Sequence, residues 1–169
     1  MRMNQGVEWA IHACVLLAPL WPGRGLSLAA LAEYHGVPAP YMAKQMQLLS
    51  KVGLVRTSRG RSGGYSLSRS PAAINLWEIA RAIDGPEPAF RCSEIRQRGP
   101  CANPREQCRQ ACSIAAAFAA AETAWRTVLQ SVTLVDVFAK AGNQSSPEQI
   151  MKSMPWLGEQ VVQFPSGEY

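Results

Sequence analysis

Four of the five cysteines lie close together in the chain, and their side chains are the first candidates for chemistry. They are Cys92, Cys101, Cys108 and Cys112. We expect no secretory leader and hence thiols that stay reduced, and clustered reduced thiols are typical of a metal site. Cys108 and Cys112 are four residues apart, which places both thiols on one side if this segment is helical. The cysteines therefore predict a bound metal.

Glu8 and His12 form a second candidate pair near the N-terminus. They are four residues apart, so on a helix their side chains emerge within about 40° of each other and both can face one ligand. Cys14 lies on another side of that helix, which favours a small buried residue over a ligand. Taken alone, Glu8 and His12 are better explained as a solvated first-turn acid and an ordinary interface histidine.

The charge distribution points to a polyanion as partner. The net charge is +5, and no acidic residue occurs between Glu33 and Glu78. That stretch contains the basic residues Lys44, Lys51, Arg56, Arg59, Arg61 and Arg69. Such a footprint suits DNA phosphates, and the alternative is a solvated basic face.

Other classes of protein lack their signatures in this sequence. We find no paired nucleophile and base, no phosphate-binding glycine loop and no zinc-hydrolase motif, so we do not expect an enzyme. No apolar run reaches the roughly 20 residues of a membrane-spanning helix. We therefore expect a cytoplasmic protein without a membrane partner.

Apolar spacing and turn residues predict the elements that position these side chains. Helices are expected over about 3–20, 28–35, 40–52, 76–83 and 113–132, followed by a short helix that Thr133 begins. The tight turn between the second and third helices is typical of a helix-turn-helix motif. Short strands over 54–57 and 65–68 flank a glycine-rich turn and predict a two-stranded wing.

The fold class is therefore mainly α, a winged helix-turn-helix with a small β wing and a long C-terminal dimerisation helix. We expect a DNA-binding domain over 1–85, a cysteine-rich loop over 86–112, dimerisation helices over 113–140 and a loosely ordered tail over 141–169. The apolar stripe of the long helix exceeds what one small domain needs, which favours dimerisation over packing within one chain.

A winged helix-turn-helix inserts its second motif helix into the major groove, while wing cations contact phosphates or the minor groove. The side chains expected to contact DNA are those of Tyr41, Lys44, Gln45, Gln47, Arg59 and Arg61.

The wing sequence resembles that of the iron-sulfur-dependent regulators typified by IscR, NsrR and RsrR. The resemblance rests on Leu54-Val55, Ser58-Arg59-Gly60 and Gly63-Gly64-Tyr65-Ser66-Leu67. It continues through Trp77-Glu78-Ile79, Ala82-Ile83-Asp84-Gly85 and Val132-Thr133-Leu134-Val135-Asp136-Val137, and only the tail lies outside it. The redox-sensing RsrR branch is the most similar, through Gly6-Val7-Glu8-Trp9-Ala10 with His12 and through Glu94-Ile95-Arg96-Gln97-Arg98-Gly99-Pro100.

This resemblance implies a homodimer that binds operator DNA and holds a [2Fe-2S] cluster between its subunits. In the RsrR-like branch glutamate and histidine come from one chain and two cysteines from the other, which carries over to Glu8, His12, Cys108 and Cys112. The commoner family pattern has three loop cysteines, so Cys92 and Cys101 remain reserve ligands or bystanders. Trp9, beside Glu8, is a candidate switch whose packing transmits the state of the cluster, or else a hydrophobic anchor of the interface.

These observations predict a transcriptional regulator, expected to be a repressor, that senses redox state through a [2Fe-2S] cluster. One alternative is a constitutive winged-helix module with a structural zinc site. A second is a regulator in which Cys108 and Cys112 form a reversible disulfide.

Overall fold

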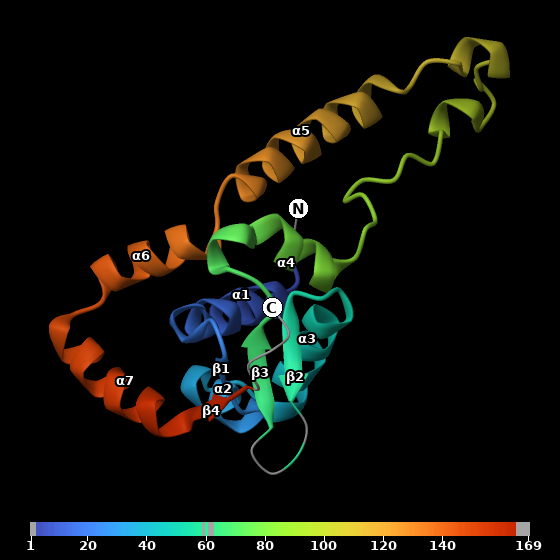
Figure 1. The fold of residues 1–169 in the computed structure, drawn as a ribbon. Coiled ribbons are helices and arrows are strands. Elements are labelled where there is room, and N and C mark those ends of the chain that lie inside the picture. The colour runs from blue at the N-terminus through green and yellow to red at the C-terminus, as the bar shows by residue number, and fades with distance from the viewer. Residues whose placement is uncertain (1–2, 59, 61–62, 165–169) are drawn as a thin grey trace.

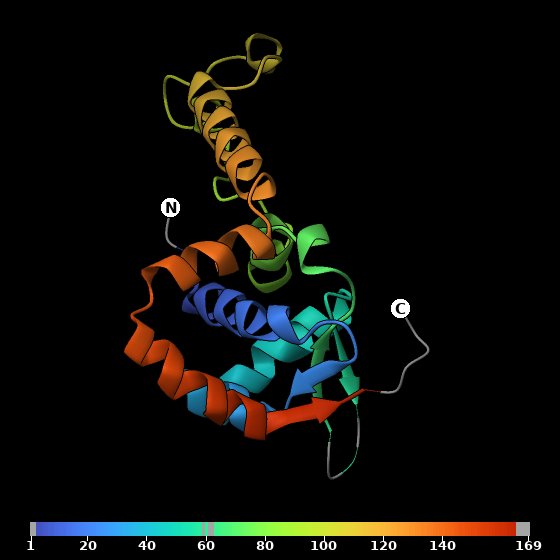
Figure 2. The same ribbon diagram turned by 60° about the vertical axis from the view of Figure 1, so that its left-hand side comes forward.

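The fold consists of a helical body with a small sheet, a projecting helical arm and a C-terminal segment that returns to the body (Figures 1 and 2). The computed structural model describes residues 3–58, 60 and 63–164. The helices are α1 (Gln5–Leu17), α2 (Leu28–His35), α3 (Ala39–Lys51), α4 (Leu76–Asp84), α5 (Ser113–Gln130), α6 (Leu134–Gln144) and α7 (Pro147–Gln160). The strands are β1 (Arg24–Leu26), β2 (Val55–Ser58), β3 (Gly64–Leu67) and β4 (Val161–Gln163). Short 3-10 turns occupy Ala18–Leu20, Pro71–Ala73, Ile95–Gln97 and Arg105–Cys108.

The helix-turn-helix motif is present where the sequence predicts it. The Ser27 hydroxyl accepts a hydrogen bond from the Ala30 N–H and so begins α2, and Gly36 ends that helix in the left-handed conformation at φ 62°. The turn leads into α3, whose buried side chains Met42, Met46 and Leu49 face the core beneath α1. The mainly helical winged fold is therefore confirmed.

The sheet is larger than the predicted two-stranded wing. It has four antiparallel strands in the order β2-β3-β1-β4. Strand β1 fits against β3 because Gly25 has no side chain: a Cβ atom there would lie 2.0 Å from the Tyr65 carbonyl oxygen. Three-residue strands such as β1 and β4 carry no alternating pattern long enough to be recognised from sequence.

The expectation of a loosely ordered tail from residue 141 is wrong for its described part. Residues up to Gln144 continue α6, and α7 then runs along the outside of the body and leads into β4, which pairs with β1 (Figure 2). Phe164 is buried beside Gly25, and the Trp156 ring lies 5.6 Å from that of Tyr34 on α2. Burial of the Phe164 ring and the contact between the Trp156 and Tyr34 rings offset the entropy of ordering the segment.

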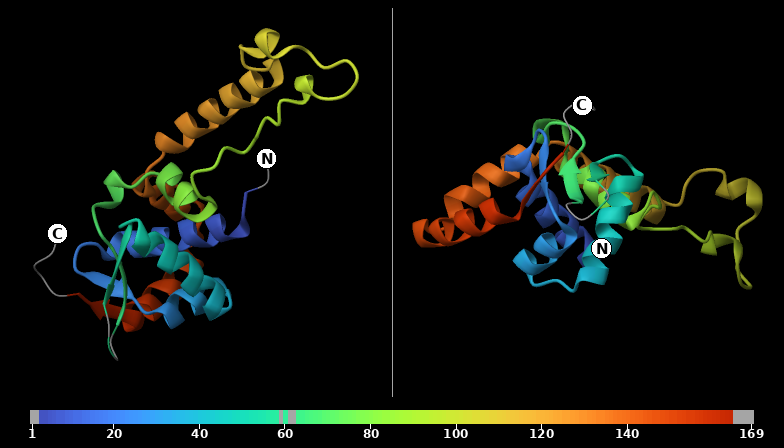
Figure 3. Two further views of the ribbon diagram at one scale, coloured as in Figure 1. Left: turned by 90° about the vertical axis from the view of Figure 1, so that its right-hand side faces the viewer. Right: turned by 60° about the horizontal axis from the view of Figure 1, so that its bottom comes forward.

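The arm contains α5 and the cysteine loop that leads into it, and it projects away from the body (Figures 1 and 3). No residue of α5 is buried, and the apolar side chains of Ile114, Phe118 and Val128 are each more than half exposed. An apolar helix face of this kind is typical of a surface that a second chain covers. In the part of the chain that the structure describes, no helix is both long and apolar enough to cross a membrane.

Candidate functional site

Glu8 and His12 both lie on the exposed side of α1, as their spacing predicts. Together they border two shallow hollows, of about 350 and 200 Å³. The smaller hollow is also lined by Trp9, His35 and Val37. The helix begins at Asn4, whose side chain accepts a hydrogen bond from the Gly6 N–H. This cap fixes the turn that presents Glu8, and both candidate ligands are accessible to a group approaching from outside the chain.

His35 lies beside His12, although nothing in its sequence context marks it as part of a site. The centroids of the two imidazole rings are 5.6 Å apart, and the Tyr34 ring centroid lies 5.0 Å from that of His35. Burial, followed by the charge of His12, lowers the pKa of His35. His35 belongs to α2, so only the packing of α2 on α1 brings the two histidines together.

Cys108 and Cys112 lie at the tip of the arm, and Arg96 organises this tip. The Arg96 guanidinium donates two hydrogen bonds to the Glu94 carboxylate, at 2.6 and 2.9 Å, and a third to the Gln110 carbonyl oxygen at 3.0 Å. Hydrogen bonding to Glu94 raises the pKa of Arg96, and the negative charges of Cys108 and Cys112 raise it further. Both thiols therefore lie near the positive charge of Arg96. The sequence analysis does not predict Arg96 as a residue of the site.

The cysteines differ in their surroundings. Cys108 and Cys112 are half-buried, whereas Cys92 and Cys101 are exposed. The backbone N–H groups of Ala115 and Ile114 lower the pKa of the Cys112 thiol, and Arg96 adds to this effect. Cys14 is fully buried on α1, and burial raises the pKa of its thiol to about 12.

The two candidate ligand pairs are not brought together within one chain. Glu8 and His12 belong to the body, and the cysteine pair lies at the far end of the arm (Figure 1). Among the described residues no group of three or more histidine, cysteine and acidic side chains is arranged to hold a metal ion. A site with all four ligands consequently requires two chains.

Trp9 connects the Glu8 region to the third helix. Its ring centroid lies 5.9 Å from that of Tyr41 on α3, with the planes inclined by 54°. Tyr41 is 57% exposed, so its ring contacts Trp9 while it remains accessible to a ligand. A displacement of the Trp9 ring would therefore change its contact with Tyr41 on the outer face of α3.

The residues predicted to contact DNA differ in their exposure to solvent. Tyr41, Lys44 and Gln47 are exposed on α3. The expectation for Gln45 is wrong, because this side chain is only 5% exposed and packs against Gly6 of α1. Helical spacing places Gln45 beside the core residues Met42 and Met46, which indicates burial, but the polar side chain at this position favoured an exposed residue. The wing residues Arg59 and Arg61 lie outside the described residues.

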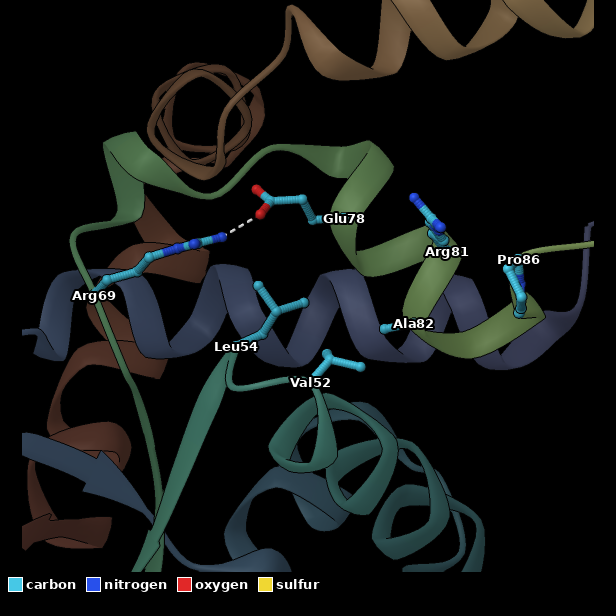
Figure 4. A pocket seen from close by; sticks show the side chains of 8 residues that line it. Val52, Leu54, Arg69, Glu78, Arg81, Ala82 and Pro86 are labelled. Atoms are coloured by element: carbon cyan, nitrogen blue, oxygen red, sulfur yellow. Dashed lines mark hydrogen bonds and ion pairs between the residues drawn. The ribbon is translucent and has the colours of Figure 1, made fainter.

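A larger hollow, of about 410 Å³, lies on another face, between the end of α3, β2 and α4 (Figure 4). Val52, Leu54 and Ala82 supply apolar lining, and an ion pair joins Arg69 to Glu78 at its edge. None of the predicted site residues borders it. Volume alone therefore does not identify the functional site of this molecule.

The family model described as "Rrf2: Iron-dependent Transcriptional regulator" matches residues 3–140 of the sequence. The chain belongs to the Rrf2 family. Proteins of this family are DNA-binding transcriptional regulators and typically dimeric, and the relatives carry the names of regulators rather than of enzymes. The segment 141–164, which contains the end of α6, then α7 and β4, follows the part that the family model matches.

Two relatives illustrate the extent of the similarity. The HTH-type regulator named Rv1287 from Mycobacterium tuberculosis is 31% identical over 140 residues, which cover 81% of each chain. An rrf2-like HTH-type regulator from Rhodobacter capsulatus is 32% identical over 149 residues, covering 85% of this chain and 96% of that protein.

Two solved structures share the fold. IscR of T. potens superimposes with a TM-score of 0.64 at 23% identity, covering 90% of this chain and 96% of that chain. CymR, the global cysteine regulator of B. subtilis, gives a TM-score of 0.65 at 23% identity, covering 83% of this chain and 98% of that chain. At this identity the two structures establish the architecture of the Rrf2-family chain.

Proposed function

We propose that this Rrf2-family chain is a homodimeric redox-sensing regulator that binds a [2Fe-2S] cluster between its subunits. Glu8 and His12 of one chain and Cys108 and Cys112 of the other are the proposed ligands. The observation that carries the proposal is the division of these residues between an accessible face of α1 and the tip of a projecting arm. In the proposed dimer each chain places its arm tip beside the α1 of the other.

The donor atoms fit such a cluster. Thiolates are its usual ligands, and histidine replaces cysteine in some clusters with raised reduction potential. Arg96 lies near both thiols, and together with the Ala115 and Ile114 N–H groups it lowers the pKa of Cys112, which favours the ligand-competent thiolate of that residue. Glu8 and His12 border the same hollows and offer one carboxylate oxygen and one imidazole nitrogen. When bound, the cluster supplies a one-electron change of charge at the subunit junction.

The chain itself provides a route from that junction to DNA. Glu8 adjoins Trp9, and Trp9 contacts Tyr41 on the exposed face of α3. A change of charge and ligation beside Trp9 biases its packing, and hence the placement of the recognition helix. Because two recognition helices must meet two half-sites at once, a small displacement in each lowers operator affinity.

The ligand assignment is tested on protein purified without oxygen, by its visible absorption, its EPR spectrum after reduction, and its iron and sulfide content. We expect a visible charge-transfer spectrum that is lost or altered in Glu8→Ala, His12→Ala, Cys108→Ser and Cys112→Ser. The matched controls Cys92→Ser and Cys101→Ser retain the wild-type spectrum. Loss in these controls with retention in the Glu8 and His12 variants would instead support a three-cysteine site.

The sharing of the site between chains is tested with mixed dimers. One chain carries Glu8→Ala and His12→Ala, and the other carries Cys108→Ser and Cys112→Ser. Neither chain alone should form the wild-type site, whereas the mixed dimer contains one complete set of ligands and should regain about half of the signal. A site within one chain would regain none.

The same preparations separate the two alternatives. Colourless protein with stoichiometric zinc would favour a constitutive DNA-binding module. A Cys108–Cys112 bridge after peroxide treatment, detected by mass spectrometry in protein that never holds iron, would favour a thiol switch. The fold shared with CymR keeps the second alternative open.

Operator binding is tested separately on α3. Lys44→Ala should weaken binding to all sequences and reduce its salt dependence, because a lysine contact to phosphate carries no sequence information. Gln47→Ala should weaken binding to the preferred sequence more than to others. Unchanged binding in both variants would remove α3 from the interface.

A further inference from the structure

Besides the chain connection that follows α4, two sets of contacts among the described residues join α5 to the body, and together they set the direction of the arm. The first lies just beyond the C-terminal end of α5. There the Leu76 N–H donates to the Val132 carbonyl oxygen and the Leu134 N–H donates to the Ile74 carbonyl oxygen, both at 3.0 Å. Asn75 and Thr133 form the antiparallel bridge between these hydrogen bonds. On its own, this short ladder fixes the position of the end of α5 but not the angle between α5 and the body.

The second contact lies further along α5 and involves Trp77 of α4. The Trp77 and Trp125 rings meet edge to face, with centroids 5.3 Å apart and planes at 89°. The Arg126 guanidinium lies 5.0 Å from the centroid of the Trp77 ring, and Arg126 also pairs with Glu122 at 3.6 Å. The Trp77 ring thus contacts both an aromatic ring and a cation from one turn of α5. The strength of each contact depends on the orientation of its partner relative to the Trp77 ring.

Trp77 is also rigidly linked to the DNA-binding part of the body. It belongs to the first turn of α4, where Asn75 and Glu78 form a reciprocal capping box. The next residues of that helix, Ile79 and Ala80, are buried, and α4 packs on both α1 and α3. The position of the Trp77 ring relative to α1 and α3 is therefore fixed, and its contact with Trp125 sets the orientation of α5 relative to these helices.

The arm acts as a lever. Trp125 lies about 9 Å along the helix from its end near Ser131, and Ser113 lies about 27 Å from that end, at 1.5 Å per residue. A displacement of 1 Å at the Trp77 contact thus becomes a displacement of about 3 Å at the cysteine tip. One base pair changes the separation of two DNA sites by about 3.4 Å.

We propose that Trp77 is a positioning residue that sets the angle between the arm and the body, and thereby the spacing of the two operator half-sites that the dimer accepts. This inference rests on the proposed dimeric, DNA-binding function. It assigns to Trp77, Trp125 and Arg126 a role in specificity that is separate from the cluster ligands and from the DNA-contacting residues.

The experiment first selects a preferred duplex from random DNA with the wild-type protein, and then varies the spacer between its half-sites one base pair at a time. Affinities are measured for every spacer at one salt concentration. We expect the wild type to show a sharp optimum. Trp77→Ala should lose about tenfold at that optimum and much less at neighbouring spacers, whereas Trp77→Phe, which keeps a ring, should retain the optimum.

A matched control separates positioning from loss of stability. Ile79→Val shortens a core side chain of the same helix and should lower affinity, if at all, by the same factor at all spacers. Arg126→Ala removes an exposed cation from the Trp77 ring and should broaden the optimum even if Trp77→Ala fails to fold. Gel filtration and thermal melting show that each variant compared is a folded dimer.

Equal loss at all spacers in both Trp77→Ala and Arg126→Ala would overturn the inference while leaving the proposed function intact. A wild-type protein that binds DNA without any spacer optimum would overturn the inference and count against a dimer with two fixed recognition helices.

Discussion

The amide of Gln45 lies flat against Gly6, so that a Cβ atom at Gly6 would be 2.7 Å from its Oε1 atom. This contact joins the first turn of α1, two residues before Glu8, to the recognition helix α3. Gln45 Oε1 is buried and accepts no hydrogen bond from the described residues. A polar side chain thus occupies a position that an apolar one would fill at lower cost.

Replacing Gln45 with leucine should increase the free energy of unfolding by about 1–2 kcal/mol, because the buried oxygen without a donor is removed and the volume is nearly conserved. Urea unfolding followed by circular dichroism measures this change. The exposed neighbour Gln47→Leu is the matched control and should alter stability by less than about 0.5 kcal/mol. A less stable Gln45→Leu protein would mean that the amide has a partner in solution.

Gly6→Ala should destabilise the fold by up to about 1–2 kcal/mol, because displacing the buried Gln45 amide costs more than the roughly 1 kcal/mol that alanine gains over glycine within a helix. Combining it with Gln45→Ala removes the overlap, so the double variant should be more stable than the sum of the two single changes predicts. Strict additivity of the two free-energy changes would show that these side chains do not meet.

The Cys14 thiol should resist modification in the native protein. It is fully buried, and burial raises its pKa to about 12, so little thiolate forms at neutral pH. Alkylation of cluster-free protein at pH 8, followed by peptide mapping, should label the exposed Cys92 and Cys101 in the native protein and Cys14 only after unfolding. Cys92 in the same sample serves as the internal control. Rapid native labelling of Cys14 would contradict the observed packing of α1.

Acid should weaken the start of α6 through Asp136. Hydrogen bonds from the Thr133 hydroxyl and backbone N–H lower the pKa of Asp136 below the value of an unfolded aspartate, which is about 4. Its contribution to stability is therefore complete above that value and is lost as the pH falls through the lower folded-state pKa. Asp136→Asn should show a shallower loss of stability below pH 4 than the wild type in thermal melts. Parallel acid profiles for the two proteins would argue against this role.

Local signals in the sequence determined the elements that carry the candidate site. Capping residues such as Ser27 and Thr133 and the terminating Gly36 act within one helical turn, so the ends they mark agree with the structure. The spacing of Glu8 and His12 is also local, since one helix sets their common face. The helix-turn-helix motif and the two strands of the wing were predictable for the same reason.

Tertiary packing alone decided the rest. Gln45 has a polar side chain, and its burial became visible only when α1 was placed against α3. Strands β1 and β4 pair Arg24 with Gln163 across most of the chain, and neither strand carries a pattern of its own. His12 meets His35, and Trp77 meets Trp125, through contacts between separate helices. Short-range preferences fix where helices begin and end, whereas these relationships depend on burial, which is a property of the whole packed chain.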